Sequence, residues 1–175
     1  MPLAVLIGPP GSGKSTVGKA LAKRLSARFQ DTDSEIEKRS GKTVSEIFVE
    51  DGEPFFRELE RTVVLEALQG FEGVLALGGG SVIDPLVADA LKSGEAPVIY
   101  LEVSLAQAAP RVGFNKDRPL LLVNPRAQWQ SLMEKRRPIY ESLAKLTLST
   151  DSAKAPEIAG QIISALHLTD SLGAE

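Results

Sequence analysis

Apolar residues gather along this chain in five short runs, separated by longer stretches in which apolar positions recur at helical spacing. The runs are rich in aliphatic and β-branched side chains, which predicts strands, and they span residues 3–7, 28–31, 74–77, 98–103 and 146–150. The other stretches predict helices over residues 14–27, 53–69, 85–93, 126–145 and 156–167. Strands that alternate with helices typically form a parallel sheet with helices on both faces. Continuously apolar strands suit that burial, so we expect a three-layer α/β fold.

Two segments interrupt this alternation. Residues 34–62 contain a capping-box pattern from Thr43 to Glu46 and a Gly-Glu-Pro helix start at residues 52–54. We interpret this segment as a helical insertion. Residues 112–125 combine glycine, asparagine and proline without a helical pattern. Two interpretations stay open for them, a plain surface loop and a mobile lid over a binding site.

Composition narrows the class of protein. A chain of 175 residues suits a single domain spanning residues 1–175, which would bury about 70% of its unfolded surface. No apolar run approaches the roughly 20 residues of a membrane span, and the N-terminus lacks the basic start of a signal peptide. The net charge of −3 gives no global attraction to nucleic acid or anionic lipid. Because the chain has no cysteine, a cytoplasmic location is the default expectation.

The stretch GPPGSGKS at residues 8–15 matches the phosphate-loop motif G-x-x-x-x-G-K-[ST], between a predicted strand and a predicted helix. In such a loop, inward-facing backbone N–H groups and the helix N-terminus bind phosphate oxygens. Lys14 would reach the β- and γ-phosphates, and the Ser15 hydroxyl would bind Mg²⁺. A simple glycine turn would not need Lys-Ser after Gly13. We therefore predict nucleotide contacts from Gly11, Ser12, Gly13, Lys14, Ser15 and Thr16.

Two aspartates, Asp31 and Asp33, follow the second apolar run. Residues two apart on a strand share a face, and the end of this strand would lie at the same sheet edge as the phosphate loop. We therefore predict that Asp31 contacts Mg²⁺ together with Ser15, and that Asp33 accepts a substrate hydroxyl. The alternative for Asp33 is structural, as the cap or acidic first turn of the helix that follows.

Three consecutive glycines, Gly78, Gly79 and Gly80, directly follow the third apolar run. Glycine loses more backbone freedom on folding than any other residue, so a plain turn would not need three of them. Close approach of the backbone to a ligand at the same sheet edge explains them better.

These features resemble the shikimate kinase family over nearly the whole chain. The resemblance also rests on the arginine in FRELE (56–60) and on the motifs RPLL (118–121) and KRRPIY (135–140). The resemblance implies a P-loop fold like that of nucleoside monophosphate kinases, with five parallel strands in the order 2-3-1-4-5. It also implies Mg²⁺- and ATP-dependent phosphorylation of the shikimate 3-hydroxyl, a step toward chorismate and the aromatic amino acids.

The resemblance further implies roles on the acceptor side of the site. Asp33 would bind the reacting hydroxyl, and Arg57 and Arg136 would grip the shikimate carboxylate. Arginine suits that task because its planar guanidinium binds a carboxylate bidentately. The glycines at 78–80 would line the same pocket, and residues 34–62 would be the substrate-binding insertion.

On the nucleotide side, the resemblance implies that Arg118 closes over the phosphates from a lid at residues 112–125. Lys14, Asp33 and Arg118 would then be the catalytic residues. Arg111 would lie beside the nucleotide, and the loop from Lys154 to Pro156 would contact adenine.

Several arginines and aromatic residues have structural alternatives. Arg57 and Arg61 would both fit a solvated helix face paired with Glu58 or Glu60, and we assign that role to Arg61 alone. Further along, Trp129, Met133, Arg136 and Tyr140 follow one another at spacings that place them on one helix face. We expect Trp129 and Met133 in the core, whereas a buried Arg136 would need an anionic partner.

Two other functions stay open from the sequence. A different small-molecule kinase of this fold, such as a gluconate kinase, would share the phosphate loop. A non-catalytic ATP-binding switch would keep Lys14 and Ser15 but would not need Asp33, Arg57 or Arg136. We expect a monomer that binds shikimate and ATP, with no nucleic-acid or membrane partner.

Overall fold

A five-stranded parallel sheet forms the centre of the protein in the computed structural model, which describes residues 1–112 and 124–170. The strands lie in the order β2-β3-β1-β4-β5, which confirms the order implied by the resemblance. Their bounds are Ala4–Ile7 for β1, Phe29–Asp31 for β2, Val74–Ala76 for β3, Val98–Glu102 for β4 and Leu146–Ser149 for β5.

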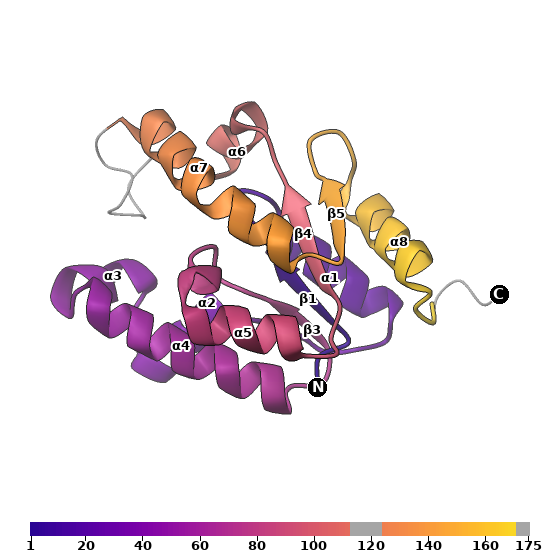
Figure 1. Cartoon of the computed structure of the whole chain (residues 1–175), viewed down its shortest axis with the longest axis horizontal. Coiled ribbons are helices and arrows are strands. Elements are labelled where there is room, and N and C mark those ends of the chain that lie inside the picture. Colours follow the sequence, from indigo (N-terminus) through magenta and orange to yellow (C-terminus); the bar gives the residue numbers. More distant parts are fainter. Residues whose placement is uncertain (113–123, 171–175) are drawn as a thin grey trace.

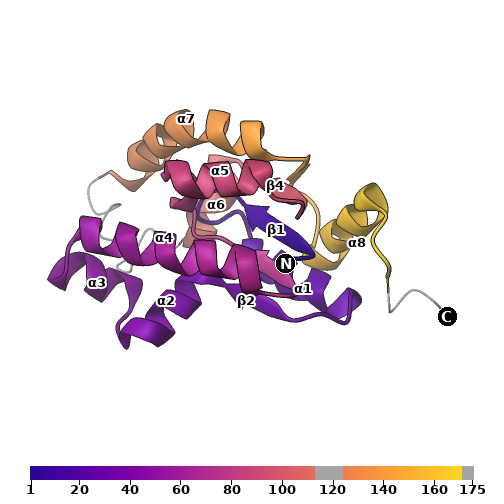
Figure 2. The ribbon, with the colours of Figure 1, turned by 60° about the horizontal axis from the view of Figure 1, so that its bottom comes forward.

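Helices cover both faces of the sheet (Figures 1 and 2). One face packs on α1 (Lys14–Arg24) and α8 (Ala155–Leu166), and the other on α4 (Glu53–Gly70), α5 (Pro85–Ser93) and α7 (Pro125–Leu143). Successive residues of β1 alternate between the two cores. Val5 and Ile7 belong to the core with α7, whereas Ala4 and Leu6 belong to the core with α1.

Burial differs between the central and edge strands. β1 and β3 are buried at every position, and only the last residue of β4 is partly exposed. The edge strand β5 alternates instead: Leu146 and Leu148 pack on the core, while Thr147 and Ser149 are exposed. Continuous apolar runs therefore mark the central strands, as predicted, and alternation appears where one face meets solvent.

The region predicted as a helical insertion contains α2 (Thr32–Ser40), α3 (Val44–Glu50) and the first half of α4. The Thr43 capping box is formed, with Glu46 N donating to Thr43 Oγ1 at 3.1 Å and Thr43 N donating to the Glu46 carboxylate at 2.7 Å. A small separate core joins these helices, and it consists of Ile36, Ile47, Phe56 and Val63. The second half of α4 contributes Val64 and Ala67 to the main core.

Two short elements were not predicted: the 3₁₀ helix η1 (Ser81–Ile83) and the helix α6 (Leu105–Val112). Helix α6 has only eight residues and contains Pro110, a residue that usually interrupts a helix, so no helix was predicted there. The sequence feature that could have indicated the start of this helix is Ser104, whose hydroxyl accepts a hydrogen bond from Gln107 N at 3.4 Å, as an N-cap does. Residues 113–123, including Arg118, lie outside the described residues, so the choice between surface loop and lid is untested.

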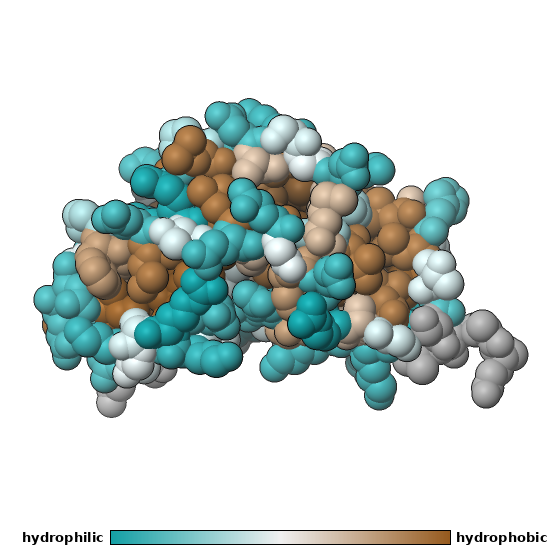
Figure 3. Space-filling model, turned by 90° about the horizontal axis from the view of Figure 1, so that it is seen from below, coloured by the Kyte–Doolittle hydropathy of each residue, from teal (hydrophilic) through white to brown (hydrophobic). Residues whose placement is uncertain are grey.

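Apolar residues on the face shown in Figure 3 lie in several groups separated by polar residues. Within residues 1–112 and 124–170, no helix is both long and apolar enough to cross a membrane.

Candidate active site

The phosphate loop joins β1 to the N-terminus of α1. Gly13 is the N-cap of α1 and has a φ of 85°, a left-handed conformation that favours glycine. No acidic residue of α1 itself lies in its first turn, so the helix does not neutralise the partial positive charge of its own N-terminus. Lys14 Nζ donates to Gly8 O at 2.8 Å and to Pro9 O at 3.0 Å, which places its ammonium group against the loop.

The two predicted magnesium ligands meet at this loop. Ser15 Oγ donates to Asp31 Oδ2 at 2.5 Å. A hydroxyl and a carboxylate are the hard oxygen ligands that Mg²⁺ takes, usually one or two from the protein with phosphates and water completing the shell. No group of three or more His, Cys, Asp or Glu among the described residues could hold a metal ion. The donor set therefore fits magnesium held jointly with a phosphate chain.

The route by which Asp33 reaches the site differs from the prediction. The strand ends at Asp31, which caps α2 by accepting from Asp33 N at 3.0 Å and Ser34 N at 3.4 Å. Asp33 thus lies in the first turn of a helix, and the prediction that Asp31 and Asp33 share a strand face is wrong. The capping role considered for Asp33 belongs to Asp31, whose side chain competes with strand continuation by bonding the backbone ahead of it.

The three glycines form the centre of the site because side chains crowd against them. A Cβ on Gly78 would lie 2.5 Å from Asp33 Oδ1, and one on Gly80 would lie 2.4 Å from Arg57 Nη1. A Cβ on Gly79 would lie 3.1 Å from Pro10 Cδ of the phosphate loop. The glycines therefore allow close approach of the protein's own residues, whereas the predicted approach to a ligand stays a prediction. Asp33, Arg57 and the phosphate loop all converge on this glycine loop.

Arg57 pairs on its own helix, as the structural alternative predicted, and it also lies against the glycine loop, while its predicted contact with a carboxylate stays a prediction. Its Nη1 donates to Glu60 Oε2 at 2.7 Å, so it does pair on its own helix, while its guanidinium also faces Gly80. Glu60 is buried, and its other oxygen accepts from Ser81 Oγ at 2.9 Å. Ser81 was not predicted to contact these residues, and Glu60 was considered only as a partner of Arg57 or Arg61 on a solvated helix face. The signal for Glu60 was its position three residues after an arginine on one helix face.

Arg61 has a structural role, as predicted, but with another partner. Its Nε donates to Asp84 Oδ2 at 2.5 Å rather than to Glu58 or Glu60. Asp84 also caps α5 through the N–H groups of Leu86 and Val87. Burial raises the pKa of Asp84, but Arg61 and these two N–H donors together outweigh it, so the pKa lies below its ordinary value.

Helix α7 presents one face to the site. Arg136 is only 5% exposed, and its Nε has no hydrogen-bond partner within the described residues. Trp129 and Met133 lie in the core as predicted. Trp129 also donates from Nε1 to Pro10 O at 3.2 Å, and Tyr140 donates from Oη to Gly79 O at 2.6 Å. Neither contact was predicted, because a pattern of helix faces does not reveal distant backbone acceptors.

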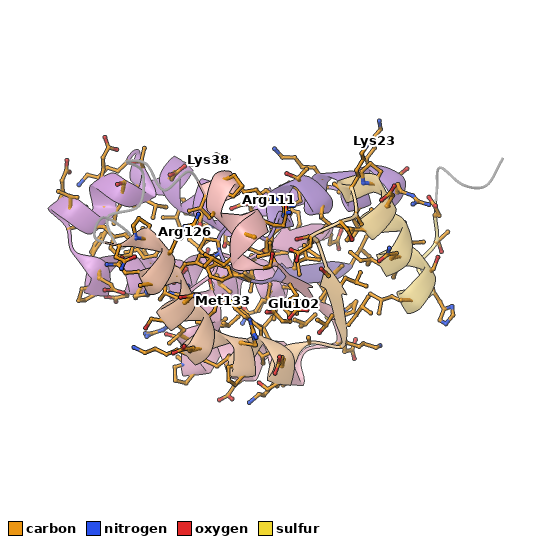
Figure 4. All side chains as sticks on the ribbon, turned by 90° about the horizontal axis from the view of Figure 1, so that it is seen from above. Lys23, Lys38, Glu102, Arg111, Arg126 and Met133 are labelled. Atoms are coloured by element: carbon orange, nitrogen blue, oxygen red, sulfur yellow. The ribbon has the colours of Figure 1, made fainter. Side chains whose placement is uncertain are left out.

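The predicted nucleotide-side residues come from two further elements. Arg111 on α6 (Figure 4) donates to Gly11 O at 3.3 Å and to Thr150 O at 3.0 Å, and it thereby links the phosphate loop to the end of β5. Lys154 is the N-cap of α8, and both Lys154 and Pro156 have exposed side chains. No described contact joins these two residues to the phosphate loop.

Comparison with known proteins gives consistent matches. The family model described as shikimate kinase matches residues 10–167. A shikimate kinase from Thermobifida fusca (strain YX) is 57% identical over 162 residues, covering 93% of this chain and 92% of that protein. The structure of a shikimate kinase from Acinetobacter baumannii in complex with shikimate is 36% identical, with a TM-score of 0.90, over 94% of this chain and 92% of that one. A deoxyadenosine kinase from M. mycoides with bound dCTP is 18% identical with a TM-score of 0.61, over 95% of this chain and 99% of that one, and is similar in fold alone.

Proposed function

Because this chain belongs to the shikimate kinase family, we propose that it transfers the γ-phosphoryl group of ATP to the 3-hydroxyl of shikimate. The products are shikimate 3-phosphate and ADP, and the reaction belongs to the route to chorismate and the aromatic amino acids. The enzyme is a phosphotransferase with a nucleotide-binding phosphate loop.

The contacts of the glycine loop are the observation that supports particular residues as the binding site for the phosphate acceptor, shikimate. The loop of Gly78, Gly79 and Gly80 lies against Asp33, Arg57 and Pro10 of the phosphate loop. A small acceptor bound there would meet a carboxylate, a guanidinium and the phosphate donor from three separate elements. The helices of residues 34–62 supply Arg57 and thus act as the substrate-binding insertion.

The proposed reaction needs positioning more than covalent chemistry, as phosphoryl transfer generally does. Asp33 holds the 3-hydroxyl and takes its proton as the oxygen attacks the γ-phosphorus. Lys14 and the N-terminus of α1 stabilise the negative charge that spreads over the phosphoryl oxygens. Ser15 and Asp31 would hold Mg²⁺, which neutralises charge on the β- and γ-phosphates.

Arg57 and Arg136 are proposed to grip the shikimate carboxylate. The burial of Arg136 and its unpartnered Nε support this role, because a buried guanidinium without an anion is costly. Arg111 is proposed to lie beside the nucleotide, and Lys154 and Pro156 beside adenine. Arg118 stays a proposed phosphate contact on sequence alone. We further propose that the enzyme acts as a cytoplasmic monomer.

The experiment that tests this function is a coupled assay of ADP release with purified protein, ATP and Mg²⁺. Steady ADP release should require shikimate, and removal of magnesium with a chelator should abolish it. Release with gluconate but not with shikimate would favour the gluconate-kinase alternative. Absence of release with either acceptor, despite ATP binding, would favour a non-catalytic switch.

A further inference from the structure

Tyr140 joins helix α7 to the glycine loop through a buried hydrogen bond. Its side chain is 0% exposed, and its Oη donates to Gly79 O at 2.6 Å. The ring stacks on Tyr100 of β4, with 5.1 Å between ring centroids and 23° between ring planes. The stack holds the phenol in place, so the position of its hydroxyl is fixed by β4 and α7 together.

Arg136 lies one helical turn before Tyr140 on the same buried face of α7, and its charge and hydrogen bonding act on the Tyr140 hydroxyl. A phenol has one O–H to donate and lone pairs to accept with, and here the O–H is used on Gly79 O. Burial raises the pKa of Tyr140 to about 12, and the charge and hydrogen bonding of Arg136 partly oppose that rise. The phenol therefore stays protonated at neutral pH and can act as the donor to Gly79 O.

We propose that Tyr140 is a positioning residue for the acceptor site, whose hydroxyl fixes the Gly79 peptide and the Arg136 guanidinium relative to each other. This proposal rests on the proposed function above. Gly79 is the link in the glycine loop that contacts Pro10, and its neighbours contact Asp33 and Arg57. A shift of the Gly79 peptide would therefore displace the acceptor pocket relative to the phosphate loop.

A matched control is available in the same stack. Tyr100 is also 0% exposed, but no hydrogen bond among the described residues joins its hydroxyl to the glycine loop. Burial raises its pKa, although nearby Arg137 acts in the opposite direction. Tyr100→Phe and Tyr140→Phe therefore remove the same atom from two stacked rings, and only the second removal breaks a bond to the glycine loop.

The test is steady-state kinetics of both variants, with kcat, the KM for shikimate and the KM for MgATP measured separately, alongside the thermal midpoint. We expect Tyr140→Phe to raise the KM for shikimate about tenfold, the scale of one lost buried hydrogen bond. The KM for MgATP should change less than about twofold, and Tyr100→Phe should change neither constant. Because KM does not depend on the amount of folded enzyme, a partly folded variant still gives a decisive answer.

A second measurement separates positioning from plain packing. If Tyr140 acts partly through Arg136, adding Tyr140→Phe to Arg136→Ala should raise the KM for shikimate by much less than it does in the wild type. Full additivity would overturn the coupling to Arg136. A lower thermal midpoint with an unchanged KM for shikimate would overturn the proposal and make Tyr140 a core residue only. A wild-type enzyme inactive with shikimate would instead reject the proposed function.

Discussion

At the scale of single residues, substitution of Asp33 is the most direct test of the proposed proton transfer from the substrate hydroxyl. Its carboxylate reaches Gly78 from the first turn of α2, and an amide of the same shape cannot take a proton from a hydroxyl. We expect Asp33→Asn to lower kcat by about 10²-fold or more, the scale of general-base catalysis. MgATP binding, measured by calorimetry, should change little. Turnover close to that of the wild type would remove Asp33 from the catalytic role.

The arginines near the glycine loop offer a second comparison at this scale. Truncating Arg57 or Arg136 to alanine should weaken shikimate binding by roughly 2–5 kcal/mol, as for buried charge pairs, and should leave MgATP binding nearly unchanged. Arg61→Ala is the control, since Arg61 pairs with Asp84 rather than facing the glycines. Binding is measured by titration with shikimate. Equal losses from Arg57→Ala and Arg61→Ala would contradict a carboxylate clamp.

At the scale of elements, the strands, the long helices and the phosphate loop could be predicted because their signals are local. Hydrophobic period, the Thr43 capping box and the glycine-rich motif each lie within a few residues of sequence. The end of β2 was misjudged, because a cap formed by Asp31 outweighs continued extension there. Contacts between elements, such as Glu60 with Ser81 or Tyr140 with Gly79, were not predictable from local pattern. They depend on how the helices dock.

Trp129 gives the prediction that belongs to helix α7 as an element. Its Nε1 donates to Pro10 O, so this end of α7 supports the phosphate loop. We expect Trp129→Phe to raise the KM for MgATP several-fold, about the effect of one hydrogen bond, with a smaller change in the KM for shikimate. Met133→Leu is the control, because Met133 lies in the same core without a hydrogen bond to the loop. A larger effect on shikimate than on MgATP would contradict this support.

At the scale of the whole molecule, Asp84 connects α4 to α5 and makes stability depend on pH. Its pKa in the folded protein lies below the ordinary value of 3.8, so its ionised form stabilises the fold above about pH 4. That contribution is lost as the pH falls through the lower, folded-state pKa. Asp84→Asn keeps a side chain that can cap α5 but loses the charge facing Arg61. Denaturant unfolding should show the wild type more stable by up to about 1 kcal/mol at pH 7, with the difference shrinking below about pH 4. A constant difference down to pH 3 would contradict this linkage.

Helix α4 belongs to two cores at once, with Phe56 and Val63 in the small one and Val64 and Ala67 in the main one. A continuous helix of 18 residues runs through both cores, so we expect the insertion to move together with α4 rather than as a separate body. We therefore expect a tilt of the end of α4 that carries Arg57 to disturb the packing of Val64 and Ala67 in the main core. If this end of α4 binds the acceptor, as proposed, the position of Arg57 depends on the core beside the sheet as well as on the small core of the insertion.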